Sequence, residues 1–195
     1  MSRHSALLQR AADYALGALD AVRPELLSRP TPCAKWNLHM LLNHISASVA
    51  AFQEGLFCGR IDLFPNAEDR VAIDSADFVR ARIRRLVADW TVTDGRPVAV
   101  ADQRIPLSLL CATAALEIAV HGWDIYQASG RYRPIPESMA ADLLAISKQL
   151  IIADIRPGLF ASPIDTVASA STGKQLLAFL GRQPAAVQSL IAETS

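Results

Sequence analysis

Apolar residues recur every three to four positions along most of the chain, which is the spacing of one buried face of an α-helix. The apolar positions within residues 3–27 predict a first helix, which Pro24 and the loop sequence RPTPC bring to an end. A second helix begins after Asn37, whose side chain makes a favourable N-cap, and Gly55 and Gly59 mark its end.

The same periodicity continues through the second half of the chain. Ser75 or Asp74 caps a third helix, and Gly130 stands just past the longest helix, where glycine is favoured. The segment PVAV predicts a short β-strand between the third and fourth helices. The expected later helices cover residues 76–90, 106–129, 136–156, 172–180 and 184–193.

These elements predict an all-α fold, with a four-helix bundle over residues 1–130 and a small helical C-terminal extension over 131–195. The 195 residues suit a single domain. The connection over residues 59–73 is long, so we expect it to be a crossover connection rather than a tight turn of an up-and-down bundle.

Charge and composition exclude several classes of partner. The chain has 19 Lys and Arg against 19 Asp and Glu, so its formal net charge is +0 and gives no general attraction for nucleic acid or an anionic membrane. The most apolar stretch, LLCATAALEIAVHGW, contains Glu117 and His121, and no run of 18 apolar residues predicts a membrane span. We expect a small-molecule substrate and a monomer or homodimer.

The N-terminus and the cysteines indicate a cytoplasmic protein. The first residues contain no uninterrupted apolar segment of the kind that a secretory signal needs. The three cysteines are odd in number and far apart, so they predict no disulfide framework and suit a reducing compartment. The sequence also lacks the glycine motifs of nucleotide-binding loops and the G-x-S-x-G motif of serine hydrolases.

Two helices carry ionisable residues in otherwise apolar surroundings. Glu117 and His121 are one turn apart on one face of the fourth helix, and His44 lies in the apolar string LLNHISA of the second. If the two helices pack together, the three side chains converge. Two histidines and one carboxylate match catalytic zinc and also the facial triad of non-haem iron. The alternative is that these are hydrogen-bonded core residues.

Other residues have two readings each. Asp124 is either an acceptor for an imidazole N–H or the partner of an arginine or a helix end. Trp36 and Trp123 are packing residues rather than substrate platforms, and Cys33 is a half-buried structural residue rather than a reactive thiol. The arginines within residues 80–85 form a solvated face, or else attract a ligand that bears a carboxylate.

Three motifs of the chain carry a family resemblance: TPCAKWNLHMLLNHI, ALEIAVHGWDIYQASG and LLAFLGRQP, which span Thr31 to Pro184. They resemble the mycothiol-dependent maleylpyruvate isomerase family of the DinB-like superfamily, in particular its short actinobacterial branch of metal-binding proteins. The family holds a divalent metal with a histidine on the second helix and a glutamate and a histidine on the fourth. The resemblance therefore implies His44, Glu117 and His121 as ligands, for zinc first and otherwise for nickel, cobalt or iron.

The resemblance also implies an activity. We expect a metal-dependent S-transferase or isomerase that uses a thiol, mycothiol, as cosubstrate and acts on a small electrophile. Members often have an Arg-Asp pair where this chain has His39 and Met40, which bears on the use of the thiol. The alternatives are a thiol-independent Lewis-acid isomerase, cyclase or hydrolase of specialised metabolism, and a non-catalytic metal-binding bundle. No general acid or base is identified beyond the ligands.

Overall fold

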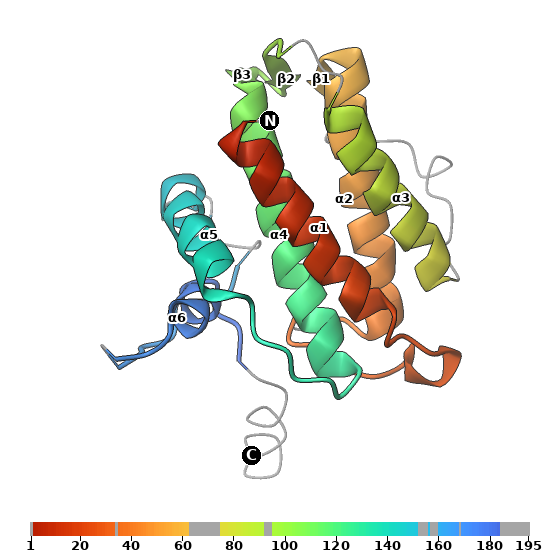
Figure 1. The fold of residues 1–195 in the computed structure, drawn as a ribbon, viewed down its shortest axis with the longest axis vertical. Helices are drawn as coiled ribbons and strands as arrows, with labels where there is room; N and C mark the ends of the chain where they lie inside the picture. Colours follow the sequence, from red (N-terminus) through yellow and green to blue (C-terminus); the bar gives the residue numbers. More distant parts are fainter. Residues whose placement is uncertain are drawn as a thin grey trace.

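The computed structural model describes residues 2–33, 35–62, 75–91, 95–151, 156, 160–167 and 169–183 of the chain. The fold is all-α, as predicted, with a helical bundle (Figure 1). Its helices are α1 (Arg3–Leu19), α2 (Leu38–Cys58), α3 (Ala76–Trp90), α4 (Leu107–Ala128), α5 (Glu137–Leu150) and α6 (Thr172–Phe179), with the 3-10 helix η1 (Pro24–Leu26) after α1. The strands are β1 (Arg60–Ile61), β2 (Val98–Val100) and β3 (Gln103–Ile105).

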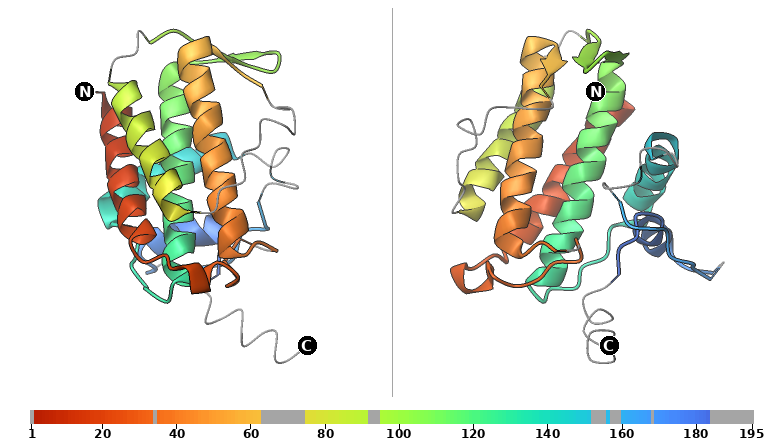
Figure 2. Two further views of the ribbon diagram at one scale, coloured as in Figure 1. Left: turned by 90° about the vertical axis from the view of Figure 1, so that its right-hand side faces the viewer. Right: turned by 180° about the vertical axis from the view of Figure 1, so that it is seen from behind.

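In the bundle, α1 lies diagonally across from α2, and α3 lies diagonally across from α4. Both α1 and α2 pack against α3 and α4, with the most extensive contact between α1 and α4. The views of Figure 2 show α5 and α6 on the outer side of α4, away from α3. Because α4 is covered by α1, α2 and α5, most of its side chains are buried, including nearly every residue from Leu110 to Ala128.

The connection between α2 and α3 is a crossover, as the length of residues 59–73 predicts. Strand β1 follows α2 directly, and β2 follows α3; the two strands pair in parallel, with Arg60 opposite Ala99. The helices α2 and α3 therefore end at the same end of the bundle and run in the same direction (Figure 1). Because α3 is about 22 Å long for its 15 residues, it begins far from the end of the bundle at which α2 ends.

The helix boundaries agree with the capping residues in the sequence. The Asn37 side chain accepts a hydrogen bond from the N–H of Met40, and Ser75 accepts from Asp77 and Phe78. Gly59 closes α2 with a positive φ of 67°, a conformation that glycine adopts without strain. Ser75 is thus the cap of α3, whereas Asp74 lies outside the described residues.

Two expected helices are shorter than predicted. Helix α1 ends at Leu19 instead of continuing toward Pro24, because Arg23 has extended backbone, which a following proline favours, and Pro24 opens a separate 3-10 turn. The predicted helix 136–156 begins at Glu137 and ends at Leu150, where the β-branched Ile151 leaves helical backbone with ψ 80°. The predicted helix 184–193 lies outside the described residues.

The predicted strand PVAV is present as β2, but it belongs to a small sheet in the order β1-β2-β3. The sequence did not predict β1 and β3, which are only two and three residues long. Such short strands carry too few residues to show the alternation of buried and exposed positions. In the part of the chain that the structure describes, no helix combines the length and apolarity needed to span a membrane.

Candidate metal centre

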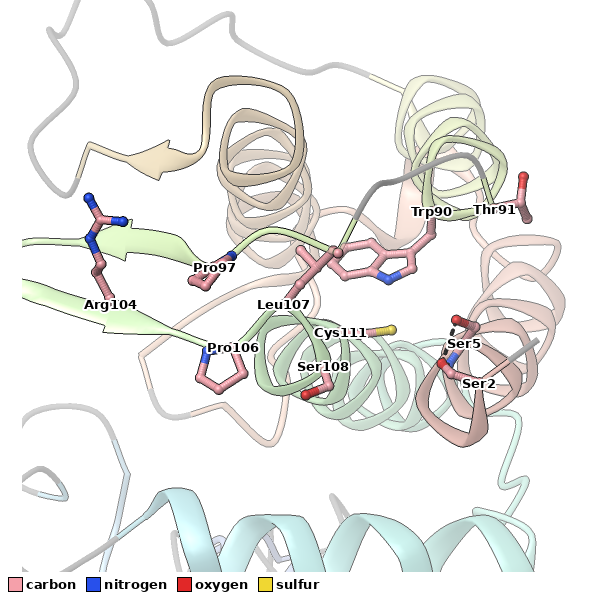
Figure 3. Close-up of a pocket in the computed structure, with 11 residues that line it drawn as sticks. Ser2, Ser5, Trp90, Thr91, Pro97, Arg104, Pro106, Leu107, Ser108 and Cys111 are labelled. Atoms are coloured by element: carbon pink, nitrogen blue, oxygen red, sulfur yellow. Dashed lines mark hydrogen bonds between the residues drawn. The ribbon is translucent and has the colours of Figure 1, made fainter.

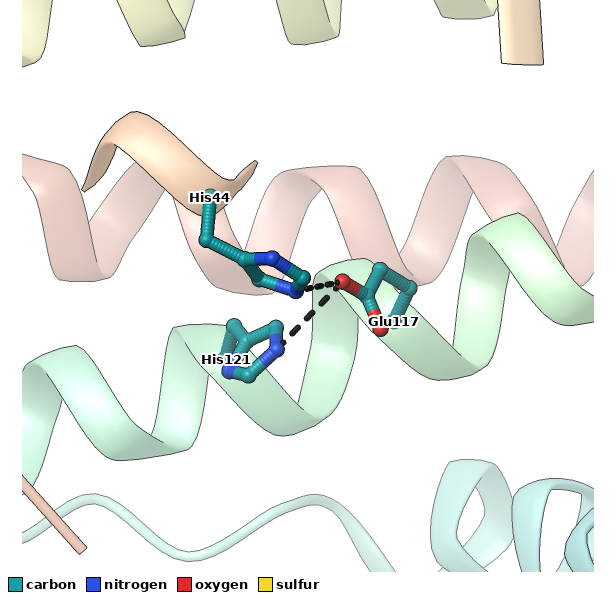
Figure 4. A group of neighbouring side chains, drawn as sticks. All are labelled: His44, Glu117 and His121. Carbon is teal, nitrogen blue, oxygen red and sulfur yellow. Dashed lines mark hydrogen bonds and ion pairs between the residues drawn. The ribbon is translucent and has the colours of Figure 1, made fainter. Parts of the chain in front are cut away.

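Helices α2 and α4 bring His44, Glu117 and His121 together (Figure 4). Nε2 of His44 lies 2.6 Å from Oε1 of Glu117, and Nε2 of His121 lies 3.3 Å from the same oxygen. One ligand atom from each side chain lies within 4.8 Å of the other two. This His–Glu–His triad, predicted from helix spacing and family resemblance, could therefore hold a metal ion.

The apolar faces of the two helices determine this geometry. Leu41, Leu42 and Ile45 of α2 are buried in the bundle, which turns the adjacent position of His44 toward α4. On α4, Glu117 and His121 are one turn apart and therefore lie on the same face.

Exposure increases across the triad. The side chain of His121 is 6% exposed, that of Glu117 is 26% exposed and that of His44 is 36% exposed. One side of the triad is therefore anchored in the bundle and the other is accessible to solvent. His44 is thus the most exposed member of the triad.

Ser48 is a further member of the site that the sequence analysis missed. Its hydroxyl donates a hydrogen bond of 2.9 Å to Oε1 of Glu117 and lies 3.5 Å from Nε2 of His44. Ser48 follows His44 by one helical turn, so the i, i+4 spacing could have found it. Oε1 of Glu117 is thus the atom on which Ser48 and both histidines converge.

Asp124 and Arg182 form the other side of the centre. Nδ1 of His121 lies 2.9 Å from Oδ2 of Asp124, and Arg182 donates to the same oxygen at 3.3 Å. Asp124 is fully buried and Arg182 is 9% exposed. Both readings of Asp124 are therefore confirmed, since it contacts an imidazole and an arginine. Arg182 was not identified, because its position depends on how the extension packs.

Charge–charge interactions outweigh burial in this network. Burial alone would raise the pKa of Glu117, but His121 and the hydrogen bonds from both histidines hold it well below its usual value. Burial would lower the pKa of His121, but Glu117 and Asp124 raise it to about 9. Burial opposes ionisation of Asp124 as well, yet Arg182 and His121 lower its pKa. His121 must therefore lose a proton before it can ligate a metal.

Trp36 packs against the imidazoles from the loop that precedes α2. Its ring centroid lies 4.5 Å from that of His44 and 6.3 Å from that of His121. The carbonyl of Trp36 accepts hydrogen bonds from the backbone N–H and the hydroxyl of Thr31, which holds the loop in place. Trp123 is buried in the core, consistent with a packing role.

Cys33 is half-buried, as expected of a structural residue. Burial raises the pKa of its thiol; Arg182 opposes this shift, whereas Asp124 and Glu117 add to it. The thiol is therefore protonated at neutral pH and is a poor nucleophile.

The arginines of α3 interact largely within the protein. Arg80 pairs with Asp20, and Arg85 pairs with Asp89. Arg82 donates to the carbonyl of Ser46 and stacks over a phenylalanine ring. These contacts argue against a site for a carboxylate ligand. The side chain of Arg85, which is 71% exposed, fits a solvated face, whereas that of Arg80 is 18% exposed.

A separate pocket of about 640 Å³ lies at the end of the bundle that carries the strands (Figure 3). Trp90, Arg104, Leu107 and Cys111 line it together with the first residues of the chain. Burial raises the pKa of Cys111 to about 12, so its thiol is protonated at neutral pH. The triad residues do not line this pocket, since His44 lies near the opposite end of the bundle, two turns into α2.

Comparison with known proteins gives distant relatives without an assigned activity. Two uncharacterized proteins of Mycobacterium tuberculosis, from strains CDC 1551 / Oshkosh and ATCC 25618 / H37Rv, are each 26% identical to this chain over 178 residues. The similarity covers 89% of this chain and 94% of each relative, so it extends over nearly the whole fold. No family model and no solved structure matches the chain.

Proposed function

We propose that His44, Glu117 and His121 bind one divalent metal ion and that the protein is a metal-dependent enzyme acting on a small molecule. The convergence of two imidazole nitrogens and one carboxylate oxygen within 4.8 Å carries this proposal. This donor set fits zinc best, and nickel, cobalt or iron are the other candidates. Three protein ligands leave coordination positions for a further ligand, and the partial exposure of His44 and Glu117 gives access to them.

The cosubstrate that we propose is a low-molecular-weight thiol, mycothiol, used in S-transfer to a small electrophile or in its isomerisation. The resemblance of the three motifs to the mycothiol-dependent family supports this choice. A bound divalent cation would supply a thiolate at neutral pH by lowering the pKa of a coordinated thiol. Cys33 is protonated at that pH, so the nucleophilic sulfur is expected to come from the cosubstrate.

The chain's own residues organise the site for this chemistry. Asp124 fixes the orientation of the His121 ring, and Ser48 donates to the Glu117 carboxylate. Trp36 packs against the His44 ring and lies near the His121 ring, which restricts the movement of both imidazoles. These contacts hold the triad in place before a substrate arrives.

We also propose that the protein acts in the cytoplasm, as a monomer or homodimer. All three cysteines, at positions 33, 58 and 111, are free, which suits a reducing compartment.

Cobalt substitution tests the thiol directly. Addition of mycothiol to the cobalt-loaded protein should produce a thiolate-to-cobalt charge-transfer band in the near ultraviolet, and an oxygen analogue of the thiol should not. The band should be absent in Glu117→Ala and His121→Ala and retained in His4→Ala, which changes a histidine of α1 outside the triad.

Each failure has a distinct meaning. If mycothiol does not bind or perturb the metal-loaded protein, the thiol-dependent function is wrong, and thiol-independent Lewis-acid chemistry takes its place. If the metal is held by four protein ligands with no exchangeable position, the enzyme proposal is wrong and the bundle only binds metal.

A further inference from the structure

We propose that Asp124 and Arg182 are positioning residues of the metal centre, through which the C-terminal extension orients the His121 ligand. This inference rests on the proposed metal site. It assigns a role to the extension, which supplies Arg182 but none of the three ligands.

The contact between Asp124 and His121 determines which ring nitrogen faces the ligand position. A carboxylate only accepts hydrogen bonds, so the 2.9 Å contact with Oδ2 of Asp124 places a hydrogen on Nδ1 of His121. Nε2 is then the nitrogen that faces Oε1 of Glu117, and it would ligate a metal once it has lost its own proton. Because the Asp124 side chain is fully buried, it cannot swing into solvent and release the ring.

Arg182 reaches Asp124 because of the way in which α6 ends. Gly181 has φ 72° and lies in a Schellman cap. In this cap the N–H of Gly181 donates a hydrogen bond to the carbonyl of Ala178, and the N–H of Arg182 donates to the carbonyl of Leu177. A Cβ at position 181 would come within 2.9 Å of the backbone of Ala161, so glycine is required there on two grounds. The cap fixes the start of the Arg182 side chain beside α4.

The contact between Arg182 and Asp124 does not have the geometry of an ion pair that serves stability alone. Arginine and aspartate commonly pair through two parallel hydrogen bonds, whereas Arg182 makes one contact of 3.3 Å to Oδ2. Among the described residues, Oδ1 of Asp124 and Nε of Arg182 have no hydrogen-bond partner. Burial of a pair so incompletely satisfied is costly. The oxygen that Arg182 holds is the one that orients His121.

Arg156 provides a matched control. It anchors the end of α6 by donating to the carbonyl of Phe179, and its guanidinium stacks over the ring of the same residue. Its contacts with the extension do not involve Asp124 or the triad. Arg156→Met therefore loosens α6 without touching the metal centre, whereas Arg182→Met removes the contact with Asp124.

The test compares zinc affinities measured by chelator competition. Asp124→Asn should weaken zinc binding by about 10–100-fold, the usual effect of removing such a partner. Arg182→Met should weaken it severalfold, and the double variant should bind about as well as Asp124→Asn alone, because both changes act through one contact. Arg156→Met should bind zinc like the parent.

The His121 ring gives a second readout in the unaltered protein. Nitrogen NMR of the zinc-loaded parent should show a proton on Nδ1 of His121 and zinc on Nε2. Arg182→Met should shift this proton signal, and Arg156→Met should leave it unchanged. A structural role confined to holding α6 would move the signal equally in both variants.

The possible failures separate the two proposals. If the parent and His121→Ala both fail to bind zinc, the proposed metal function is wrong. If the parent binds zinc and His121→Ala does not, but Asp124→Asn and Arg182→Met match the parent, the positioning role is wrong. Zinc on Nδ1 of His121 in the parent would also overturn it, whether or not the variants fold.

Discussion

The two faces of α4 show opposite kinds of packing. Toward α1, Gly122 is so close to Ala15 that an added Cβ would lie 3.0 Å from its Cα, and Tyr14 fills the space beside it. Toward α2, the adjacent His121 belongs to a polar network with Glu117. The first face is packed too closely for a side chain at position 122, whereas the second buries ionisable groups at a cost in desolvation. Packing thus explains the α1 face, whereas the α2 face carries the triad for which we propose a metal ion.

Removal of Tyr14 should have the largest effect on folding. Its ring packs against Tyr126 with centroids 5.2 Å apart, and its hydroxyl donates to the carbonyl of Arg133. Tyr14→Ala should lower the free energy of unfolding by about 3–5 kcal/mol, the range for truncating a buried aromatic side chain. Urea denaturation measures the loss. The metal stoichiometry of the folded variant should equal that of the parent. If the variant also loses metal binding, the two faces of α4 are not independent.

Metal binding should add stability through the opposite face. At a free metal concentration of 100 times Kd, the parent should gain about 2.7 kcal/mol, because the ion binds the folded state alone. Thermal melts with and without zinc measure the gain. His44→Ala should show none, although its metal-free melting should stay near that of the parent because the side chain is one-third exposed. A zinc-dependent shift in His44→Ala would place the ion elsewhere.

Substitution of Gly122 should disturb the α1 face more moderately. Gly122→Val forces a branched side chain against Ala15 and Tyr14, and overpacking of this kind costs about 1–3 kcal/mol. Equilibrium denaturation should show this loss while zinc affinity remains within a few-fold of the parent. A large loss of affinity would show that the spacing of α1 and α4 also determines the position of His121.

The smallest expected effect is at the surface between α1 and α5. The hydrogen bond from Arg3 lowers the pKa of Asp142 against the opposing effect of burial, and Arg10 lowers it further. Because the folded pKa is lowered, the stabilisation is complete above the unfolded value of about 3.9 and is lost as pH falls through the folded value. For an exposed pair it is at most about 1 kcal/mol.

Asp142→Asn should therefore be less stable than the parent at pH 6 and should approach it near pH 3, as measured by denaturation at both values. A difference that grows on acidification would contradict the sign of this pKa shift.

The sequence predicts what local chemistry determines and misses what depends on distant packing. Asn37 and Ser75 cap the helices as expected, because an N-cap acts within three residues. The candidate triad could be predicted because Glu117 and His121 share one helix face and because the motifs around them resemble a metal-binding family. Arg182 was missed because it is 58 residues from Asp124, and only the packing of α6 brings the two together.

The early end of α1 shows that apolar periodicity alone also fails to predict where a helix ends. Apolar periodicity continues past Leu19, but Pro24 and the extended Arg23 impose a separate turn. Periodicity indicates which face would be buried, whereas the backbone restrictions around proline determine where the helix cannot continue.

The central claim is that His44, Glu117 and His121 bind one metal ion, and elemental analysis after equilibration with zinc and removal of free metal tests it most directly. The account predicts about one zinc per chain in the parent and in His4→Ala, and none in His44→Ala, Glu117→Ala or His121→Ala. Affinity in the parent should fall as pH is lowered, because ligating imidazoles must lose their protons. Retention of stoichiometric zinc by all three triad variants would contradict the account.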